Sequence, residues 1–364
     1  MYHSWDFVHW SLADSAPKAK RFPGGECPAL FRLPALVPGT TLSSVGATSL
    51  STAEEPVVPT HVHKHSEGGD WMQLGVYDEG APNSTGSWTA TGPPTKIDHG
   101  SFYASKPFYD PVKDRQILWG WAMPASLITV PREITFDPRL SLLCFNPARE
   151  LEMLRVQPPL ANFTTAMTIP AGSSKSLGNW SGSVGNTSDV TVRFKVPAMA
   201  TTFGLGMMTG PAGIPTALAF VDFVPPPAGD AGNFSVSVGV RLPTSASDHT
   251  PDSSGPGKGP VATLQMLPGD TTLDIRCLFD NTVAELFWMG GRVAMTVRLR
   301  ATKQAGFTVF ASAGERGASV ESGSGSGSGS GAAAVELESA QAWRMGSMWV
   351  SKAEVLRQHR ASHS

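Results

Sequence analysis

The carboxylate with the most unusual neighbours is Glu26, in the stretch Gly24-Gly25-Glu26-Cys27-Pro28. A carboxyl group held in a weakly hydrated place has a raised pKa. Such a group keeps its proton near neutral pH and can act as a general acid. The alternative is an ordinary surface residue, which is the usual position of a lone glutamate. Taken alone, the stretch favours the surface interpretation.

A second stretch, 98–121, combines aromatic rings with polar side chains. It contains Asp98, Tyr103 and Trp121, with serine and lysine residues between them. Ring faces stack on the C–H surfaces of a sugar, and polar side chains bind its hydroxyl groups. The stretch therefore has what a sugar site needs. Without further information, a core strand followed by a solvated turn is the favoured interpretation.

The third stretch, 280–292, contains two carboxylates, Asp280 and Glu285. Its pattern predicts a hairpin of a β-sandwich. Both carboxylates are therefore interpreted as structural or surface groups and not as catalytic ones.

Cysteines and histidines give no metal site by their spacing. The three cysteines show no C-x-x-C pattern, which argues against a zinc site or a disulfide scaffold. His63 and His65 would share one face of an extended segment, but no carboxylate spacing beside them supports a metal ion. We expect neither a metal nor a cofactor.

The composition favours two β-rich domains. A chain of 364 residues is long enough for two domains, and 41% hydrophobic residues can fill a sizeable core. The 38 glycines and 30 prolines suit many short strands joined by turns. A net charge of -2 gives no reason to expect a nucleic-acid partner. No apolar run is long enough to predict a membrane helix.

Alternation of apolar side chains predicts strands in most of the chain. Alternation is clearest at 190–196, 234–242 and 293–299, and the less regular apolar runs 71–77 and 117–123 are interpreted as buried strands. Short helices are expected within 146–154 and from residue 351, where capping residues precede apolar ones. Loops are expected where proline, glycine and serine accumulate, at 209–230, 244–260 and 322–331. A change in composition at 156–175 marks the expected domain boundary.

Taken together and in this order, the stretches resemble glycoside hydrolase family 32, the invertases and fructan hydrolases. Glu26-Cys27-Pro28 follows a Ser-x-Asp-Phe-Val-His-Trp segment, as in that family. Further similar segments are 103–106, 109–111, 117–121, 130–135, 280–292 and 342–350. The resemblance covers nearly the whole chain.

The resemblance implies an all-β fold, a five-bladed β-propeller followed by a β-sandwich. Residues 1–158 would form the C-terminal part of the propeller, 159–352 the sandwich and 353–364 a tail. The implied reaction is retaining hydrolysis of a terminal β-D-fructofuranoside, sucrose or a fructan, by two carboxylates.

The resemblance also implies roles for individual residues. Glu26 matches the family's acid/base, and Cys27 adjoins it and would shape its pocket. Tyr103 and Trp121 match positions that line the fructose site. Asp98 matches the aspartate that opens the family's Asp-x-Gly segment, and we group it with the substrate-binding residues.

Parts of the family pattern are missing from the sequence. Neither the Asn-Asp-Pro-Asn block that carries the family's nucleophile nor its Arg-Asp-Pro block is present. We therefore expect this chain to be a fragment that is inactive alone. The aspartate–lysine pair that helps plant members hold sucrose has no match after His61–Ser66, so a preference for sucrose does not follow from the resemblance and another fructoside stays open.

Two alternatives to a fructosidase stay open. The first is a fructosyltransferase of the same fold, because water and sugar compete for one fructosyl-enzyme intermediate. The second is a non-catalytic protein that binds carbohydrate or a partner. Five N-x-[ST] sequons and the resemblance favour a secreted or vacuolar full-length protein; they begin at Asn83, Asn162, Asn179, Asn186 and Asn233.

Overall fold

The computed structural model describes most of the chain, and the described part is almost entirely β-structure. The described residues are 2–4, 6–12, 24–42, 57–79, 86–123, 127–181, 186–207, 215–227, 229, 232–242, 259–299, 304–312 and 333–347. Their one regular helix is a short 3₁₀ helix, η3 (Arg149–Leu154). No helix among these residues is long and apolar enough to cross a membrane.

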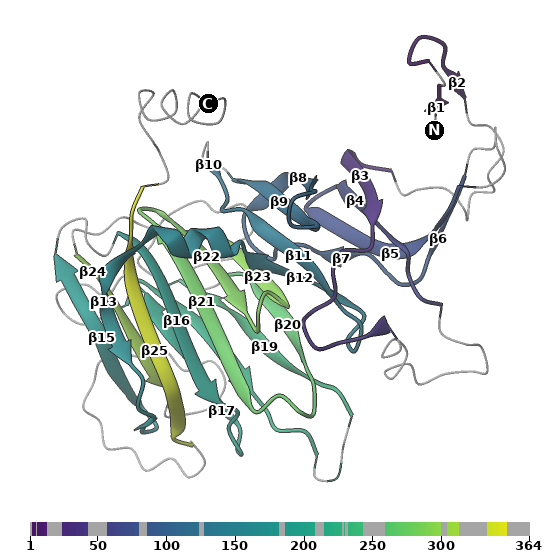
Figure 1. Ribbon diagram of the computed structural model, residues 1–364. Coiled ribbons are helices and arrows are strands. Elements are labelled where there is room, and N and C mark those ends of the chain that lie inside the picture. The colour runs from purple at the N-terminus through teal and green to yellow at the C-terminus, as the bar shows by residue number, and fades with distance from the viewer. Residues whose placement is uncertain are drawn as a thin grey trace.

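Two antiparallel sheets of the propeller-blade type form the first part of the chain (Figure 1). The first sheet consists of β3 (Glu26–Arg32), β4 (His61–Ser66), β5 (Asp70–Asp78) and β6 (Ser87–Ala90), with β7 (Thr95–Lys96) beside β5. The second consists of β8 (Phe102–Asp110), β9 (Arg115–Ala122), β11 (Arg132–Asp137) and β12 (Leu142–Pro147), with β10 (Leu127–Ile128) beside β9. A separate two-stranded piece pairs β1 (Tyr2–His3) with β2 (Ser11–Leu12).

The second part of the chain is a sandwich of two antiparallel sheets (Figure 1). One sheet contains β13 (Arg155–Phe163), β25 (Val335–Met345), β16 (Thr187–Lys195), β21 (Thr272–Asp280), β22 (Val283–Trp288) and β23 (Val293–Arg298), with β14 (Met167–Ile169) beside β25. The other contains β15 (Ser173–Ser181), β24 (Gln304–Ala311), β17 (Thr201–Met207), β18 (Ala217–Phe223), β19 (Phe234–Arg241) and β20 (Val261–Met266).

Alternating side chains build the sandwich core. On β16, Val190, Val192 and Phe194 are buried, and Phe194 packs edge-on against Phe203 of the facing sheet. Successive side chains of a strand point to opposite faces, so every second residue of both sheets enters one apolar layer. A smaller core, which includes Leu118 and other apolar residues of both blade sheets, holds those sheets together.

A fully buried arginine joins the blade sheets to the sandwich. Arg132 of β11 forms ion pairs with Asp98 at 2.8 Å and with Glu285 of β22 at 2.7 Å. Its guanidinium group lies between the rings of Phe102 and Phe287. This cluster has partners in both parts of the chain, so it fixes how the two parts meet.

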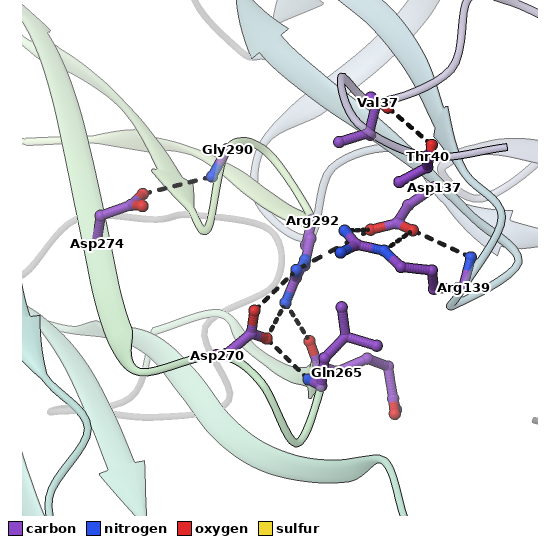
Figure 2. Close-up of polar contacts among 10 residues, drawn as sticks. Val37, Thr40, Asp137, Arg139, Gln265, Asp270, Asp274, Gly290 and Arg292 are labelled. Carbon is purple, nitrogen blue, oxygen red and sulfur yellow. Dashed lines mark hydrogen bonds and ion pairs between the residues drawn. The ribbon is translucent and has the colours of Figure 1, made fainter. Parts of the chain in front are cut away.

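A second polar contact crosses the same boundary (Figure 2). Arg292, just after β22, binds Asp270 and reaches Asp137 of β11 at 4.0 Å. Asp137 also accepts two hydrogen bonds from the guanidinium of Arg139. The sandwich therefore contacts the blade sheets through two separate sets of largely buried charges.

The predicted fold class is confirmed, and strands lie at all five places where the sequence predicts them most clearly. One local prediction is wrong, and a second is right for the helical residues but wrong about where the helix starts. The expected loop 209–230 contains β18, which pairs with β17 on one side and β19 on the other and points every second side chain into the sandwich core. The expected helix within 146–154 begins only at Arg149, because Asn146 and Pro147 still pair with β11.

Three further sequence predictions concern the chain's boundaries and ends. The first sandwich strand, β13, begins at Arg155, slightly before the predicted boundary at residue 158. The predicted helix from residue 351 and the glycine–serine loop 322–331 lie outside the described residues.

Candidate functional site

Glu26 and Tyr103 meet at one end of the two blade sheets. Glu26 is the first residue of β3, and Tyr103 lies near the start of β8. The Tyr103 hydroxyl donates a hydrogen bond to Oε2 of Glu26 at 2.9 Å. This hydrogen bond raises the pKa of Tyr103, because ionising the phenol would remove the donor and place two negative charges together. The structure thus brings together two of the five residues singled out for the site.

Glu26 does not lie in a weakly hydrated place, in agreement with the surface interpretation that its stretch favours when taken alone. Its side chain is exposed, although glycine, cysteine and proline surround it in the sequence. Gly25 has no side chain and Cys27 is only half-buried, so the neighbours in sequence do not enclose the carboxyl group. The surroundings of Glu26 are therefore set by Tyr103 and not by a dry pocket.

Trp121 lies beside Tyr103 and adds an aromatic surface. The two residues are paired partners on β9 and β8, and Trp121 is 42% exposed. A large aromatic ring that remains exposed next to a carboxylate can stack on the C–H face of a sugar. Glu26, Tyr103 and Trp121 together form a polar and aromatic surface suited to a carbohydrate.

Two β-bulges place these side chains. The pairing of β3 with β4 shifts between Glu26 and Ala29, and that of β8 with β9 shifts between Tyr103 and Lys106. Each bulge contains a non-glycine residue with positive φ, Cys27 at 47° and Ala104 at 49°. Such backbone is strained, and a bulge re-aims the side chains beside it.

Cys27 lies inside the first bulge and is half-buried. Its carbonyl oxygen accepts a hydrogen bond from Nζ of Lys64 at 3.4 Å. The next carbonyl, that of Pro28, accepts one from Lys106 at 2.8 Å. Cys27 thus contributes to the shape of the site through its backbone.

Asp98 does not join this group. It is 4% exposed, and its carboxylate accepts hydrogen bonds from the backbone of Gly100 and from both the backbone and hydroxyl of Thr296. Together with the ion pair to Arg132, these contacts engage both oxygens at the boundary with the sandwich. The geometry therefore favours a structural role for Asp98 over the expected contact with sugar.

Sequence reasoning missed Lys64 and Asp70, which are buried directly behind Glu26 and Tyr103. In the sequence, the one indication of this pair is a lysine and an aspartate in two strand-like segments that a short turn connects. That indication could not show which residues they contact, since those residues come from strands distant in sequence.

The histidines of β4 form a stacked pair and not a metal cluster. The rings of His63 and His65 are 5.6 Å apart, and burial lowers the pKa of His63 to about 4. Within the described ranges, no group of three histidine, cysteine or acidic side chains is arranged to hold a metal ion.

The chain matches two models of one enzyme family. The model for the N-terminal domain of glycosyl hydrolases family 32 matches residues 1–138. The model for the C-terminal domain of the same family matches residues 150–325. The two matches follow the order of the blade sheets and the sandwich.

Curated relatives carry the same family identity. An insoluble β-fructofuranosidase isoenzyme from Arabidopsis thaliana is 28% identical over 340 residues, which covers 82% of this chain and 58% of the relative. A fructan 6-exohydrolase from Triticum aestivum is 26% identical over 349 residues, with 82% and 56% covered. The chain thus spans little more than half the length of these relatives.

Solved structures show a similar fold. Fructan 1-exohydrolase IIa from Cichorium intybus gives a TM-score of 0.64 at 22% identity, covering 95% of this chain and 66% of that one. An exo-inulinase from Aspergillus awamori gives 0.59 at 16% identity, covering 96% and 62%. Since both family models, in order, account for most of the sequence, this chain belongs to glycosyl hydrolases family 32.

Proposed function

We propose that this chain supplies the acid/base side of a retaining β-fructofuranosidase site, with Glu26 as the group that gives and takes the proton. The observation that carries the proposal is the 2.9 Å hydrogen bond from Tyr103 to Glu26 beside the exposed ring of Trp121. Glu26 also stands in the Glu-Cys-Pro motif by which the sequence resembles the family. The names of the relatives, a β-fructofuranosidase and a fructan exohydrolase, support a terminal fructoside as substrate.

The Tyr103 hydroxyl suits both steps of such a reaction. Glu26 protonates the leaving oxygen in the first step and removes a proton from water in the second. A hydrogen bond donated to the carboxylate favours its ionised form. In the first step this bond stabilises the negative charge that Glu26 gains on giving up its proton, and in the second step it holds the carboxylate in place for the attack of water.

The reaction needs a second carboxylate about 5–5.5 Å from the first. The family's Asn-Asp-Pro-Asn and Arg-Asp-Pro blocks do not occur in the 364 residues. We expect the 364-residue chain alone to release no fructose, and activity to require a polypeptide that also supplies these aspartates.

The substrate proposal includes both sucrose and fructans. A variant of the Cichorium enzyme was solved in complex with 1-kestose, and other relatives are insoluble or acid β-fructofuranosidases. These names and the sequons support a secreted or vacuolar protein. Of the sequons, Asn162 is exposed, and Asn83 lies outside the described residues.

The test compares Glu26→Gln with Glu79→Gln in the native protein that contains this sequence. Glu79 is an exposed glutamate just beyond the far end of β5 from Glu26, so its substitution is the matched control. Fructose release from sucrose and 1-kestose should fall by about 10²–10⁴-fold in Glu26→Gln and stay near the parent rate in the control. Equal rates of fructose release in the two variants would show that Glu26 is not the acid/base.

A further inference from the structure

Lys64 and Asp70 form a buried ion pair behind the site. Lys64 on β4 is 0% exposed and Asp70 at the start of β5 is 1% exposed, with Nζ 3.3 Å from Oδ2. Burial lowers the pKa of Lys64, and the charge of Asp70 opposes that effect. Removing two charges from water is costly, and apolar residues often replace such a pair without loss of stability. Stability alone therefore does not account for an ion pair at this place.

The contacts of the pair lead to both bulges. Lys64 donates to the carbonyl oxygen of Cys27 at 3.4 Å and to the Ser66 hydroxyl at 2.7 Å. Asp70 accepts a hydrogen bond from the backbone N–H of Ser105 at 2.7 Å, through the same oxygen that faces Lys64. Cys27 lies in the bulge next to Glu26, and Ser105 lies in the bulge next to Tyr103. One ion pair thus connects the two strained segments.

We propose that the Lys64–Asp70 ion pair is the positioning element of the site, which fixes the bulge bearing Glu26 against the bulge bearing Tyr103. The pair holds both bulges through backbone groups, and no hydrogen bond or ion pair joins it to the Glu26 carboxyl group or the Tyr103 hydroxyl; the charge of Asp70 also contributes to the raised pKa of Tyr103. Because the bulges are strained, they need an external tie to keep the two side chains at hydrogen-bond distance. This inference rests on the proposed function only in one respect, which is that Glu26 is the acid/base.

The test reads the Tyr103–Glu26 contact directly in the 364-residue chain. The sequence has 4 tyrosines, so labelling their Cζ atoms with ¹³C gives a simple spectrum, and Tyr103→Phe identifies the signal. Between pH 3 and 8 the Tyr103 signal should follow the ionisation of Glu26. Glu26→Gln should abolish that inflection and define the signal of a broken contact.

The decisive variant is Lys64→Met/Asp70→Leu, which removes both charges and so leaves no unpaired charge buried. We expect its Tyr103 signal to lose the inflection and move to the Glu26→Gln position. Asp189→Asn is the matched control, because Asp189 is a buried aspartate paired with Arg155 and Arg276 in the sandwich. The control should keep the inflection.

Two results would overturn the proposal. The first is an unchanged Tyr103 inflection in the double variant. The second is a parent signal that does not respond to Glu26→Gln, because there would then be no contact to position. Neither NMR result depends on fructose release. If the native protein were inactive but its Tyr103 signal still followed the ionisation of Glu26, only the proposed function would be contradicted.

Discussion

Replacing Arg132 with methionine tests how the two parts of the chain are held together. Arg132 is completely buried, and its ion pairs reach Asp98 from one part and Glu285 from the other. Methionine fills much of the space between Phe102 and Phe287, but it leaves two carboxylates buried without a cation. Removing one partner from a buried ion pair typically costs about 3–5 kcal/mol.

Urea unfolding of the 364-residue chain measures this cost. With a slope near 2 kcal/mol/M, a loss of this size lowers the midpoint by about 1.5–2.5 M. Lys195→Met is the control, since Lys195 and Glu336 form an exposed pair with side chains 51% and 39% accessible. Such surface pairs contribute at most about 1 kcal/mol. If Arg132→Met were no more destabilising than the control, the reasoning about the buried cluster would be refuted.

Asp98→Asn separates the two roles considered for Asp98. If Asp98 is a structural partner of Arg132 and Thr296, the substitution should lower the urea midpoint. It should leave the KM of the native protein for its fructoside unchanged. A raised KM with an unchanged urea midpoint would instead show that Asp98 contacts the substrate.

Three further outcomes follow from the surroundings of the site. Burial lowers the pKa of His63 to about 4, so between that pH and about 6.5 this residue binds more protons in the unfolded chain than in the folded one. Its contribution to stability is therefore full above this window and falls through it on acidification, so the urea midpoint of His63→Gln should fall less across the window than that of the parent chain. Iodoacetamide should modify Cys27 alone, because the other two cysteines are buried and burial raises the pKa of both thiols; equal labelling of all three in peptide mass spectra would contradict this. Gly25→Ala places a Cβ 3.0 Å from the Cβ of His65 at a φ of 138°, so the urea midpoint should show a loss of about 1–3 kcal/mol in the free energy of unfolding. In the control, Gly24→Ala, the added Cβ meets open space, and the midpoint should stay nearly unchanged.

Sequence reasoning succeeded where one strand's own pattern decides the structure. The buried alternation around Val190 and Val236 is visible in the letters, and both segments are strands of the sandwich. It failed at β18, because proline and glycine on both sides of Ala217–Phe223 concealed a short buried strand. Local composition therefore predicted regular strands better than strands that lie between irregular segments.

For the site, the resemblance identified Glu26 and Tyr103, which are 77 positions apart and meet in the structure. Chemistry alone could not select them, since a lone glutamate is usually a surface residue. Lys64 and Asp70 were not predicted, because their significance lies in contacts with two other strands. Asp98 was grouped with the sugar-binding residues by its motif, but its partners come from a strand far along the sequence.

The most direct test of the central claim is azide rescue of Glu26→Ala in the native protein that contains this sequence, with an aryl β-fructoside as substrate. A good leaving group needs no proton donor, so the first step should survive the substitution while the attack of water stalls without its base. We predict that azide restores turnover and yields β-fructosyl azide with retained configuration. Full hydrolysis without azide, or no response to azide, would contradict the assignment of Glu26 as the acid/base.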